Sequence, residues 1–409
     1  MKDFEVEITD YGYDGEGVGH LDGKVVFVPY LLKGERALCR ATKEKSSFIQ
    51  AKVVKVCKQS PLRQTPSCPY FGRCGGCGYQ HIDYGCELEI KRQILARQLA
   101  KVGYVGQIEV VPSPKEYGYR NKLRLFVGEG GLSLKMRGSD KLVPIERCLL
   151  VSGPMNEAIF KINNFIKNQN LCGVYSEVVL REECGQILIN FHVKTPKEVN
   201  YQGLFLVVGD CGIFETFRGQ TTHKMGLTQL ICKEMGLNCR FSPKSFHQVN
   251  TFLTENLYKK VIESLLGDNI ANCYSGAGVL SGVIAKSGKN VVGIELGESE
   301  HCDAENLKKE NNLSTLTNIC GDCGQVLQDI KLNFDTIIVD PPRAGMAESV
   351  CQSINQSGVQ RVVYVSCNSA TLIRDIARLN CYSLQNAILF DMFARTGEYE
   401  VLCILTRQA

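Results

Sequence analysis

The fold of this chain is decided by the stretch Asn269-Ile-Ala-Asn-Cys-Tyr-Ser-Gly-Ala-Gly-Val279. Its mostly apolar first half, 269–274, predicts a buried strand, and the glycines after it predict a tight turn into a helix. Four further strand–helix alternations follow along the chain. The five strands are predicted at 269–274, 289–294, 313–319, 334–340 and 360–366. Repeated units of this kind predict a parallel sheet with right-handed crossovers and helices on both faces.

Segments on either side complete this third zone of the chain, 241–409. A long helix is predicted at 250–266, ahead of the first strand, and two apolar strands are predicted at 384–390 and 400–405. Ligands of such α/β sheets bind beyond the carboxyl ends of the strands. We therefore expect the functional residues of this zone to lie in the loops that follow its strands.

Two other zones come first. Residues 1–58 contain short apolar segments separated by glycine turns, which predict a small β-barrel. Such barrels often bind RNA or oligosaccharide on one face, and a barrel with merely solvated lysines is the alternative. Residues 59–240 begin with a proline- and cysteine-rich segment. Helices predicted at 86–101 and 156–167, with strands between and after them, indicate an α+β region.

The composition is that of an ordinary globular chain apart from its 20 cysteines among 409 residues. The start, Met1-Lys-Asp-Phe-Glu5, lacks the pattern of a signal peptide, and no apolar run is long enough to span a bilayer. We therefore expect a cytoplasmic protein with no membrane association, whose clustered cysteines serve metal binding or catalysis. A net charge of +4 alone is too weak to indicate a nucleic-acid partner, but residues 111–147 carry a net positive charge of their own.

A nucleotide-type cofactor is indicated by the glycine turn 275–279, which lies between a strand and a helix. Glu295 closes the second strand and suits an acid that binds two ribose hydroxyls. Both NAD and S-adenosylmethionine fit this arrangement. The third glycine of the dinucleotide fingerprint is absent, and Asp322 follows the third strand, where an acid can meet an adenine amino group. These two features favour S-adenosylmethionine, and a helix N-cap is the alternative role of Asp322.

The sharpest motif is Asp340-Pro-Pro-Arg-Ala-Gly345, at the end of the fourth predicted strand. Each proline fixes its φ and lacks an N–H, so the pair forms a stiff edge of the pocket. Methyltransferases that act on amino groups place an aromatic ring after such a Pro-Pro pair, to stack on the base. Arg343 occupies that position here, which disfavours methylation of an exocyclic amine.

A cysteine nucleophile is predicted in Val365-Ser-Cys-Asn-Ser369, where Cys367 follows the fifth strand and precedes a helix whose N-terminus would favour the thiolate. Taken alone, such a residue is more often a core cysteine. Beside a methyl donor, however, a thiol serves methylation of carbon 5 of a pyrimidine. That carbon is a poor nucleophile until a thiolate adds to carbon 6 and generates an enolate. A base must then remove the carbon-5 proton, and Glu400 is the candidate.

Three cysteines form the array Cys68-Pro-Tyr-Phe-Gly-Arg-Cys74-Gly-Gly-Cys77 in a glycine-rich loop. Their thiolates need a fourth ligand to hold zinc or a four-iron cluster. Cys86 and Cys148 are the candidates, and Cys148 is preferred because Cys86 opens a helix. The spacing of the array differs from the C-x3-C-x2-C that serves radical chemistry, which disfavours a radical enzyme.

Jointly, these motifs resemble those of the RNA uracil-5-methyltransferases that carry an N-terminal TRAM barrel and an iron–sulfur cluster, typified by bacterial 23S rRNA enzymes. Gly15-Glu-Gly-Val18 and Val26-Phe-Val-Pro29 resemble the TRAM pattern, and the resemblance covers essentially the whole chain. It implies a TRAM barrel at 1–58, a central α+β domain with the cluster at 59–240, and a Rossmann-like methyltransferase domain at 241–409.

The resemblance also implies the functional residues. The ligands of a [4Fe-4S] cluster would be Cys68, Cys74, Cys77 and Cys148. The segment Phe246-His-Gln-Val-Asn250 resembles the family's cofactor segment. The residues that contact S-adenosylmethionine would be Gln248, Tyr274, Glu295, Asp322 and Asp340. Cys367 matches the family's nucleophile, and Glu400 matches its base.

The chain departs from the family pattern near both sites. The first glycine motif usually begins with an acid-Leu pair and a cysteine, whereas this chain has Asn272-Cys-Tyr-Ser275. The family often has a histidine two residues before the catalytic glutamate, where this chain has Glu398. A second carboxylate so close would raise the pKa of Glu400 if both face the pocket.

The expected function is S-adenosylmethionine-dependent methylation of carbon 5 of a uridine in 23S rRNA, by a monomer whose cluster is structural. The RNA would dock on the barrel and the basic central zone, with the target uridine flipped into the pocket beneath Asp340-Pro-Pro342. The same reaction on a tRNA T-loop uridine is the nearest alternative. A non-catalytic RNA-binding or iron–sulfur protein and a redox or radical enzyme are the alternatives from other classes.

Overall fold

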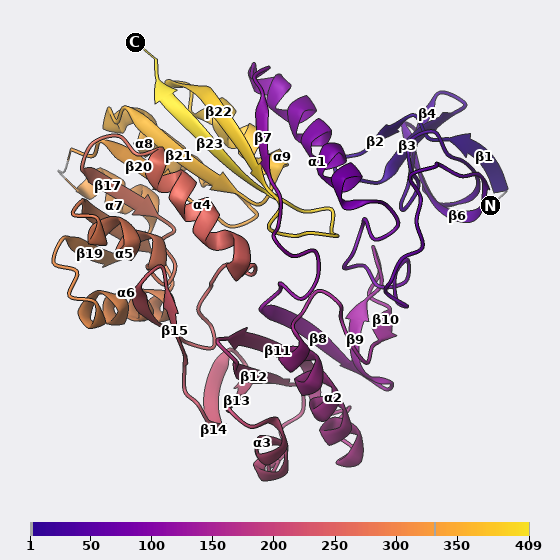
Figure 1. The fold of residues 1–409 in the computed structure, drawn as a ribbon, viewed down its shortest axis with the longest axis horizontal. Helices are drawn as coiled ribbons and strands as arrows, with labels where there is room; N and C mark the ends of the chain where they lie inside the picture. The colour runs from indigo at the N-terminus through magenta and orange to yellow at the C-terminus, as the bar shows by residue number, and fades with distance from the viewer. Residues whose placement is uncertain (1–2, 331–332, 409) are drawn as a thin grey trace.

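The computed structural model describes residues 3–330 and 333–408, and in these residues the strands form four sheets of eight, seven, six and two strands. Figure 1 shows the three larger sheets as separate lobes, with the C-terminal sheet at the upper left, the N-terminal sheet at the right and the third sheet below. The predicted fold class is confirmed, since an α/β C-terminal part is joined to a strand-rich N-terminal part and a mixed central part.

The C-terminal sheet has the strand order β19-β18-β17-β20-β21-β23-β22-β7. Strands β17 to β21 are parallel, and β23 runs antiparallel to both β21 and β22. The bounds are β17 Asn269–Cys273, β18 Asn290–Glu295, β19 Leu316–Cys320, β20 Thr336–Val339, β21 Arg361–Ser366, β22 Tyr382–Phe390 and β23 Glu400–Arg407. All seven strands predicted for this zone are present, with ends that differ by a few residues.

Helices cover both faces of this sheet. In β21, Val363 and Val365 belong to a core cluster shared with α4, α5 and α6, whereas Val362 and Tyr364 belong to a cluster shared with α7, α8 and α9. The bounds are α4 Thr251–Glu263, α5 Val279–Lys286, α6 Glu298–Glu310, α7 Cys323–Asp329, α8 Glu348–Ser357 and α9 Ser369–Arg378. This is the predicted arrangement of a parallel sheet between two helical layers.

Two segments of the range 59–240 belong to the C-terminal body rather than to the central one. Strand β7 (Ile108–Val111) pairs in parallel with β22, and the preceding helix α1 (Tyr84–Leu99) buries Leu95 and Leu99 in the same core as α8 and α9. The hairpin of β15 (Leu230–Glu234) and β16 (Leu237–Phe241) packs on the opposite face. The predicted boundaries therefore do not coincide with the packing units, because β22 gains its outer partner from a segment about 280 residues earlier.

The central body is a seven-stranded sheet with the order β10-β9-β8-β11-β12-β13-β14. Helices α2 (Gly153–Asn168) and α3 (Gln202–Val208) share one core cluster with it. The bounds of the strands are β8 Lys122–Gly128, β9 Gly131–Lys135, β10 Leu142–Pro144, β11 Tyr175–Glu183, β12 Gln186–Val193, β13 Cys211–Phe217 and β14 Gln220–Gly226. The 3-10 turn η1 (Ala100–Val102) ends α1.

The N-terminal body is a curled six-stranded sheet with the order β1-β5-β6-β4-β3-β2. Its small core includes Val6, Val26, Val28 and Cys39. The bounds are β1 Asp3–Glu7, β2 Asp10–Tyr11, β3 Gly17–Leu21, β4 Lys24–Val28, β5 Arg36–Glu44 and β6 Phe48–Lys58. Among all the described residues, no helix combines the length and apolarity needed to cross a membrane.

Candidate active site

A cleft opens at the carboxyl ends of β17 and β20. Gln248, Tyr274 and Asp340 line it together with Asn272 and the glycine turn after β17. The Gln248 side-chain amide donates to Asp340 Oδ2 at 3.3 Å, which closes the cleft on one side. Three of the five predicted cofactor residues therefore share one cleft at the sheet edge where α/β folds bind their ligands.

The glycine turn follows a strained backbone. Tyr274 has a φ of 60°, and Gly276 and Gly278 have φ values of 54° and 81°. A left-handed tyrosine costs about 1 kcal/mol and is typical of functional sites. A Cβ on Gly278 would lie 2.8 Å from the Cβ of Ala304, so this glycine lets the turn lie directly against α6. The turn thereby presents backbone rather than side chains to a ligand.

The other two predicted cofactor residues, Glu295 and Asp322, lie outside the lining of this cleft. Glu295 accepts the N–H of Gly276 at 2.9 Å and that of Gly297 at 2.8 Å, so its carboxylate is fixed at the glycine turn. Asp322 accepts the N–H of Gln325 at 3.1 Å and caps α7, which is the alternative role considered from the sequence. Their contacts with a cofactor remain a prediction.

The segment that carries Gln248 is anchored by a buried ion cluster. His247 contacts Glu183 Oε1 through Nδ1 at 2.9 Å and Glu234 Oε2 through Nε2 at 2.7 Å. Burial alone would lower the pKa of His247, but the hydrogen bonds to both carboxylates outweigh it and raise this pKa to about 9. The Asn121 side-chain amide donates both to Glu183 and to the carbonyl of Gln248. The central sheet, the β15–β16 hairpin and the cofactor cleft therefore meet at one imidazolium.

The predicted nucleophile and base lie on neighbouring strands. Cys367 follows β21, and Glu400 begins β23, which pairs with β21 through Ser366 and Val401. Burial and the nearby carboxylates of Glu400 and Asp340 raise the pKa of Cys367 to about 12. Burial raises the pKa of Asp340 to about 7. The structure thus brings the predicted thiol and base together beside the acid that lines the cofactor cleft.

Burial and nearby carboxylates oppose ionisation of Cys367. Helix α9 begins just after this residue, as predicted, whereas burial and neighbouring negative charge raise the pKa of its thiol. The contribution of the helix N-terminus to the thiolate stays a prediction. The expectation for Glu398 is confirmed, because it joins burial and Asp340 in raising the pKa of Glu400 well above its usual range.

A partly exposed ion pair borders the thiol. Arg343 Nη2 lies 2.6 Å from Glu398 Oε1, so the arginine of the Asp-Pro-Pro-Arg motif is bound to the residue that departs from the family pattern. Both side chains line a larger polar cavity together with Arg120 and Arg137 of the central body. This ion pair therefore faces the junction between the lobes, where the two arginines of the central body also stand.

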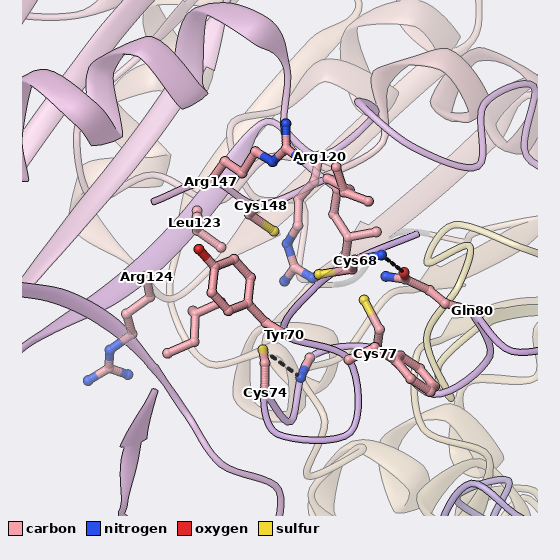
Figure 2. A pocket seen from close by; sticks show the side chains of 15 residues that line it. Cys68, Tyr70, Cys74, Cys77, Gln80, Arg120, Leu123, Arg124, Arg147 and Cys148 are labelled. Atoms are coloured by element: carbon pink, nitrogen blue, oxygen red, sulfur yellow. Dashed lines mark hydrogen bonds between the residues drawn. The ribbon is translucent and has the colours of Figure 1, made fainter. Parts of the chain in front are cut away.

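The four predicted cluster cysteines surround one cavity. Figure 2 shows the side chains of Cys68, Cys74, Cys77 and Cys148 around this cavity. Its volume is about 220 Å³. Cys86 instead packs in a separate apolar cluster of α1 and does not line this cavity. Within residues 3–330 and 333–408, no three His, Cys, Asp or Glu side chains stand close enough together to hold a metal ion. The cysteines are gathered, but they do not converge on one point.

Sequence reasoning missed the residues that support these sites. The partners of His247 lie 64 and 13 residues away along the chain, so only its place beside Gln248 could have drawn attention to it. A second buried ion network, around Lys91 and Arg395, carries no motif at all. Its only indication in the sequence is Lys91, which lies on the apolar face of the helix α1.

Comparisons with known proteins agree with this geometry. A family model described as tRNA (uracil-5-)-methyltransferase matches residues 227–408, and a TRAM domain model matches residues 2–54. The chain is 31% identical to a tRNA (uracil(54)-C(5))-methyltransferase of Pyrococcus abyssi, over 95% of this chain and 97% of that protein. This chain belongs to the RNA uracil-5-methyltransferase family.

Further members of the family differ in their substrates. The chain is 29% identical to a 23S rRNA (uracil(1939)-C(5))-methyltransferase of Francisella tularensis subsp. novicida, over 99% of this chain and 97% of that protein. The crystal structure of the Pyrococcus abyssi tRNA (uracil-54, C5)-methyltransferase with S-adenosyl-L-homocysteine superposes with a TM-score of 0.83, at 29% identity, and covers 98% of this chain and 99% of that one. The protein is therefore an RNA uracil-5-methyltransferase.

The His247 clamp predicts a specific pH dependence of stability. The pKa of His247 is raised from 6.5 to about 9 in the folded protein, so its stabilisation is full below about pH 6.5 and is lost as pH rises through 9. We expect His247→Gln to lower the free energy of unfolding by roughly 3 kcal/mol at pH 6, and by much less at pH 10. Urea unfolding of this variant and of His20→Gln, an exposed control, measures the difference. A loss that stays constant with pH would contradict the clamp.

Two substitutions at Asp322 separate capping from cofactor binding. Serine can still cap α7, whereas alanine loses the cap and about 1 kcal/mol of stability. If the carboxylate also binds the cofactor, both variants should bind S-adenosylmethionine about tenfold more weakly, a loss of about 1.4 kcal/mol. Calorimetric titration of the two variants measures this. Wild-type affinity in Asp322→Ser would show that the residue is only a cap.

Proposed function

We propose that this enzyme uses S-adenosylmethionine to methylate carbon 5 of a specific uridine in 23S rRNA, through a covalent adduct with Cys367. One observation carries the proposal: Asp340 lines the cofactor cleft and is also the carboxylate that raises the pKa of both Cys367 and Glu400. The cofactor cleft, the thiol and the base therefore adjoin, which is what addition, methyl transfer and proton removal at one pyrimidine ring require.

The chemistry assigns one task to each side chain. The thiol of Cys367 gives its proton to water, and the thiolate sulfur bonds to carbon 6 as the electron pair of the 5,6 double bond moves onto carbon 5 as an enolate. S-adenosylmethionine supplies the electrophilic methyl group to that carbon when bound. The ionised Glu400 then takes the carbon-5 proton, the electron pair of that carbon–hydrogen bond restores the 5,6 double bond, and the electron pair of the carbon–sulfur bond returns to sulfur. The product leaves with Cys367 regenerated.

The raised pKa of the base fits this order of events. Burial raises the pKa of Asp340, and burial together with the charges of Asp340 and Glu398 raises the pKa of Glu400, which makes Glu400 a stronger base once it is ionised. Arg343 is the cation nearest to these groups, and it lowers the pKa of both Cys367 and Glu400. We therefore assign Arg343 to the stabilisation of negative charge as the thiol and the base ionise.

The cofactor is assigned to the cleft at the carboxyl ends of β17 and β20. Gln248, Tyr274 and Asp340 line it, and the backbone of the glycine turn approaches it closely. Glu295 and Asp322 stand at the ends of the next two strands, where acids bind ribose hydroxyls and an adenine amino group in this type of fold.

The RNA is assigned to the junction between the three lobes. A cavity there, of about 460 Å³, is lined by Asp14 of the N-terminal sheet, Arg120 and Arg137 of the central body, and Arg343. Arginines bind phosphate oxygens bidentately, which suits the backbone around a flipped nucleotide. The N-terminal TRAM sheet and the basic stretch 111–147 would extend this contact.

The four cavity cysteines are assigned to a [4Fe-4S] cluster with a structural role. A single zinc ion needs its ligands at one point, whereas each cysteine of a four-iron cluster binds a different iron. Four thiols arranged around a space rather than a point suit the cluster better. Methylation at carbon 5 transfers no electrons to or from a metal, so the cluster would hold the loop 68–77 to the strands around Cys148.

The tRNA T-loop uridine is the second candidate substrate. It is supported by the 31% identity and the high structural similarity to the Pyrococcus abyssi tRNA enzyme. The TRAM domain together with the four cysteines around one cavity favours 23S rRNA. Incubation with labelled S-adenosylmethionine and either RNA, followed by mass-spectrometric mapping of 5-methyluridine, decides between them. Absence of product with both RNAs would overturn the proposal.

Variants of the two catalytic residues are expected to fail at different steps. Cys367→Ala cannot add to carbon 6, so it should form neither product nor adduct. Glu400→Gln retains the buried side-chain shape but cannot take the proton, so the methylated RNA should stay attached to Cys367 and survive denaturing electrophoresis. We expect product formation by each variant to fall by at least about 100-fold. Activity near the wild-type level in either variant would refute its assigned role.

The cluster predicts a difference between Cys148 and Cys86. Cys148→Ser should lose iron, sulfide and the broad visible absorption of the cluster, because it removes one of four ligands. Cys86→Ser is the matched control, since Cys86 is a nearby half-buried cysteine outside the cavity, and it should keep all three signals. Stoichiometric zinc instead of iron, or equal iron in Cys148→Ser and wild type, would contradict the assignment.

A further inference from the structure

A buried network of charges joins α1 to the segment that precedes the proposed base. This segment, 391–399, connects β22 to β23 and carries Glu398 just before Glu400. Its first five residues are nearly inaccessible to solvent, and two of them, Asp391 and Arg395, are charged. Buried charges require partners, so the position of the segment depends on what these two side chains contact.

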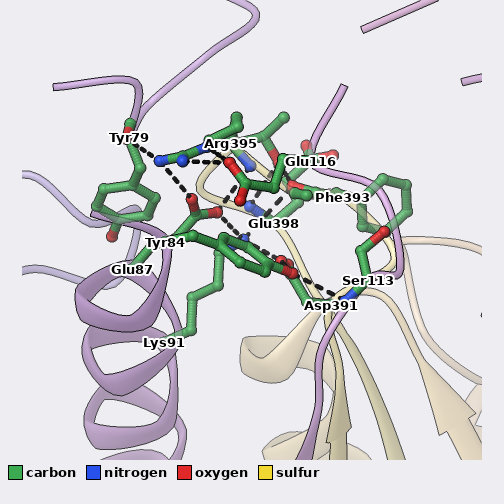
Figure 3. A network of polar contacts seen from close by, with 12 residues as sticks. Tyr79, Tyr84, Glu87, Lys91, Ser113, Glu116, Asp391, Phe393, Arg395 and Glu398 are labelled. Atoms are coloured by element: carbon green, nitrogen blue, oxygen red, sulfur yellow. Dashed lines mark hydrogen bonds and ion pairs between the residues drawn. The ribbon is translucent and has the colours of Figure 1, made fainter. Parts of the chain in front are cut away.

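Asp391 is held by α1. Lys91 Nζ donates to Asp391 Oδ1 at 2.6 Å, to Glu87 Oε1 at 2.7 Å and to the carbonyl of Phe393 at 3.4 Å. The Tyr84 hydroxyl donates to Asp391 Oδ2 at 2.7 Å. The side chains of Lys91 and Glu87 are fully buried. Figure 3 shows them with Tyr84 and Asp391 in this network. The start of the segment is therefore bound to the helix by a buried cation, whose Nζ also lies 5.8 Å from the centre of the Tyr79 ring.

Arg395 connects the same segment to the cysteine loop. Its Nη1 donates to the carbonyls of Tyr79 and Ile82, at 3.2 and 2.8 Å, and its Nε and Nη2 donate to Glu116. In the opposite direction, its carbonyl accepts the N–H groups of Gly78 and Tyr79 at 2.9 and 3.2 Å. Gly78 directly follows Cys77. Arg395 therefore binds the segment that directly follows the cysteine array, through hydrogen bonds from both its side chain and its backbone.

The backbone of Arg395 is itself unusual. Its φ is 66°, in the left-handed region that a non-glycine residue adopts only when its surroundings hold it there. Its N–H donates to Glu87 Oε1 at 2.8 Å, so the carboxylate that binds Lys91 also fixes this turn. A buried network of paired charges specifies one geometry, because breaking any pair leaves an unpaired charge.

We propose that Arg395 is a positioning residue for the methyltransferase reaction: it fixes the segment 391–399, and with it Glu400, against the cysteine loop. This inference rests on the proposed function, in which Glu400 removes the carbon-5 proton. Glu400 follows Arg395 by five residues, and Gly397 lies beside Gly78, with a Cβ on Gly78 only 3.3 Å from the Gly397 nitrogen. The loop that carries the cysteines thus packs against the segment that positions Glu400.

A displaced Glu400 should affect one late step of the reaction and leave the earlier steps unchanged. Glu400 acts only after sulfur has bonded to carbon 6 and the methyl group has been transferred. A displaced Glu400 therefore slows proton removal and the breaking of the carbon–sulfur bond, while it leaves the earlier steps in place. A displacement of about 1 Å reduces the rate of such a step on the order of 100-fold. The methylated covalent intermediate should then accumulate, whereas a general loss of structure would reduce adduct and product together.

The test compares three variants of the full chain with the wild type. Arg395→Gln removes the guanidinium, and Arg395→Lys keeps the positive charge without it. Glu116→Gln weakens the ion pair between Glu116 and Arg395, at a side chain that is partly exposed. Arg92→Gln is the matched control, because Arg92 lies on the exposed face of α1 and pairs only with Glu89. Each is mixed with S-adenosylmethionine and the RNA substrate, and denaturing electrophoresis with mass spectrometry measures methylated adduct and free product.

We expect Arg395→Gln and Glu116→Gln to accumulate adduct and to form product 10- to 100-fold more slowly, with unchanged affinity for S-adenosylmethionine. Arg395→Lys should recover part of the rate, and Arg92→Gln should behave as the wild type. Equal loss of adduct and product, or a wild-type product rate in folded Arg395→Gln, would overturn the proposal. If Arg395→Gln does not fold, Glu116→Gln decides by the same readout.

Failure of this inference differs from failure of the proposed function. Glu400→Gln is run beside these variants as the reference for a missing base. If it accumulates adduct and the Arg395 and Glu116 variants do not, only the positioning role is wrong. If Glu400→Gln itself forms product at the wild-type rate, the role of the base is wrong and the positioning role falls with it.

Discussion

The buried carboxylate of Asp340 is the constraint on which the active site depends. It stands at the end of β20, lines the cofactor cleft with Gln248, and raises the pKa of Cys367 and Glu400. Burial raises the pKa of Asp340, and burial together with the neighbouring carboxylates raises the pKa of both Cys367 and Glu400. The ionisation of the proposed nucleophile and of the proposed base therefore depends on the same buried acid.

The supporting charges are organised differently from those of the site. His247 is bound by two carboxylates, and Lys91 and Arg395 are bound by Glu87, Asp391 and Glu116, so nearly every buried charge outside the pocket has a partner. These clusters join segments that are distant in the sequence, and they lie on two sides of the active site. These paired charges support the frame around the pocket, where Arg343 is the cation that lowers the pKa of both Cys367 and Glu400.

Most of the C-terminal fold could be predicted from the sequence, because each of its strands is a short apolar run followed by a turn and a helix. The glycine turn, Asp340, Cys367 and Glu400 could be found for the same reason, since functional residues of this fold follow its strands. Strand β7 could not, because four residues give little periodicity and its partner Ala387 lies far along the chain. The residues that support the site could not be predicted for a related reason. Glu183, Glu234 and Arg395 hold it only through contacts between segments that are distant in the sequence. The raised pKa of the thiol could not be predicted either, since the helix N-terminus is apparent from sequence but the surrounding carboxylates are not.

Covalent catalysis by Cys367 is the central claim, and a substrate RNA with 5-fluorouridine at the target position tests it most directly. Fluorine replaces the proton that Glu400 would remove, so addition and methyl transfer proceed but elimination cannot. The account predicts a stable RNA–protein adduct that carries one methyl group, and peptide mapping by mass spectrometry should place the nucleotide on Cys367. An adduct on another residue, or turnover of the RNA without any adduct, would contradict the account.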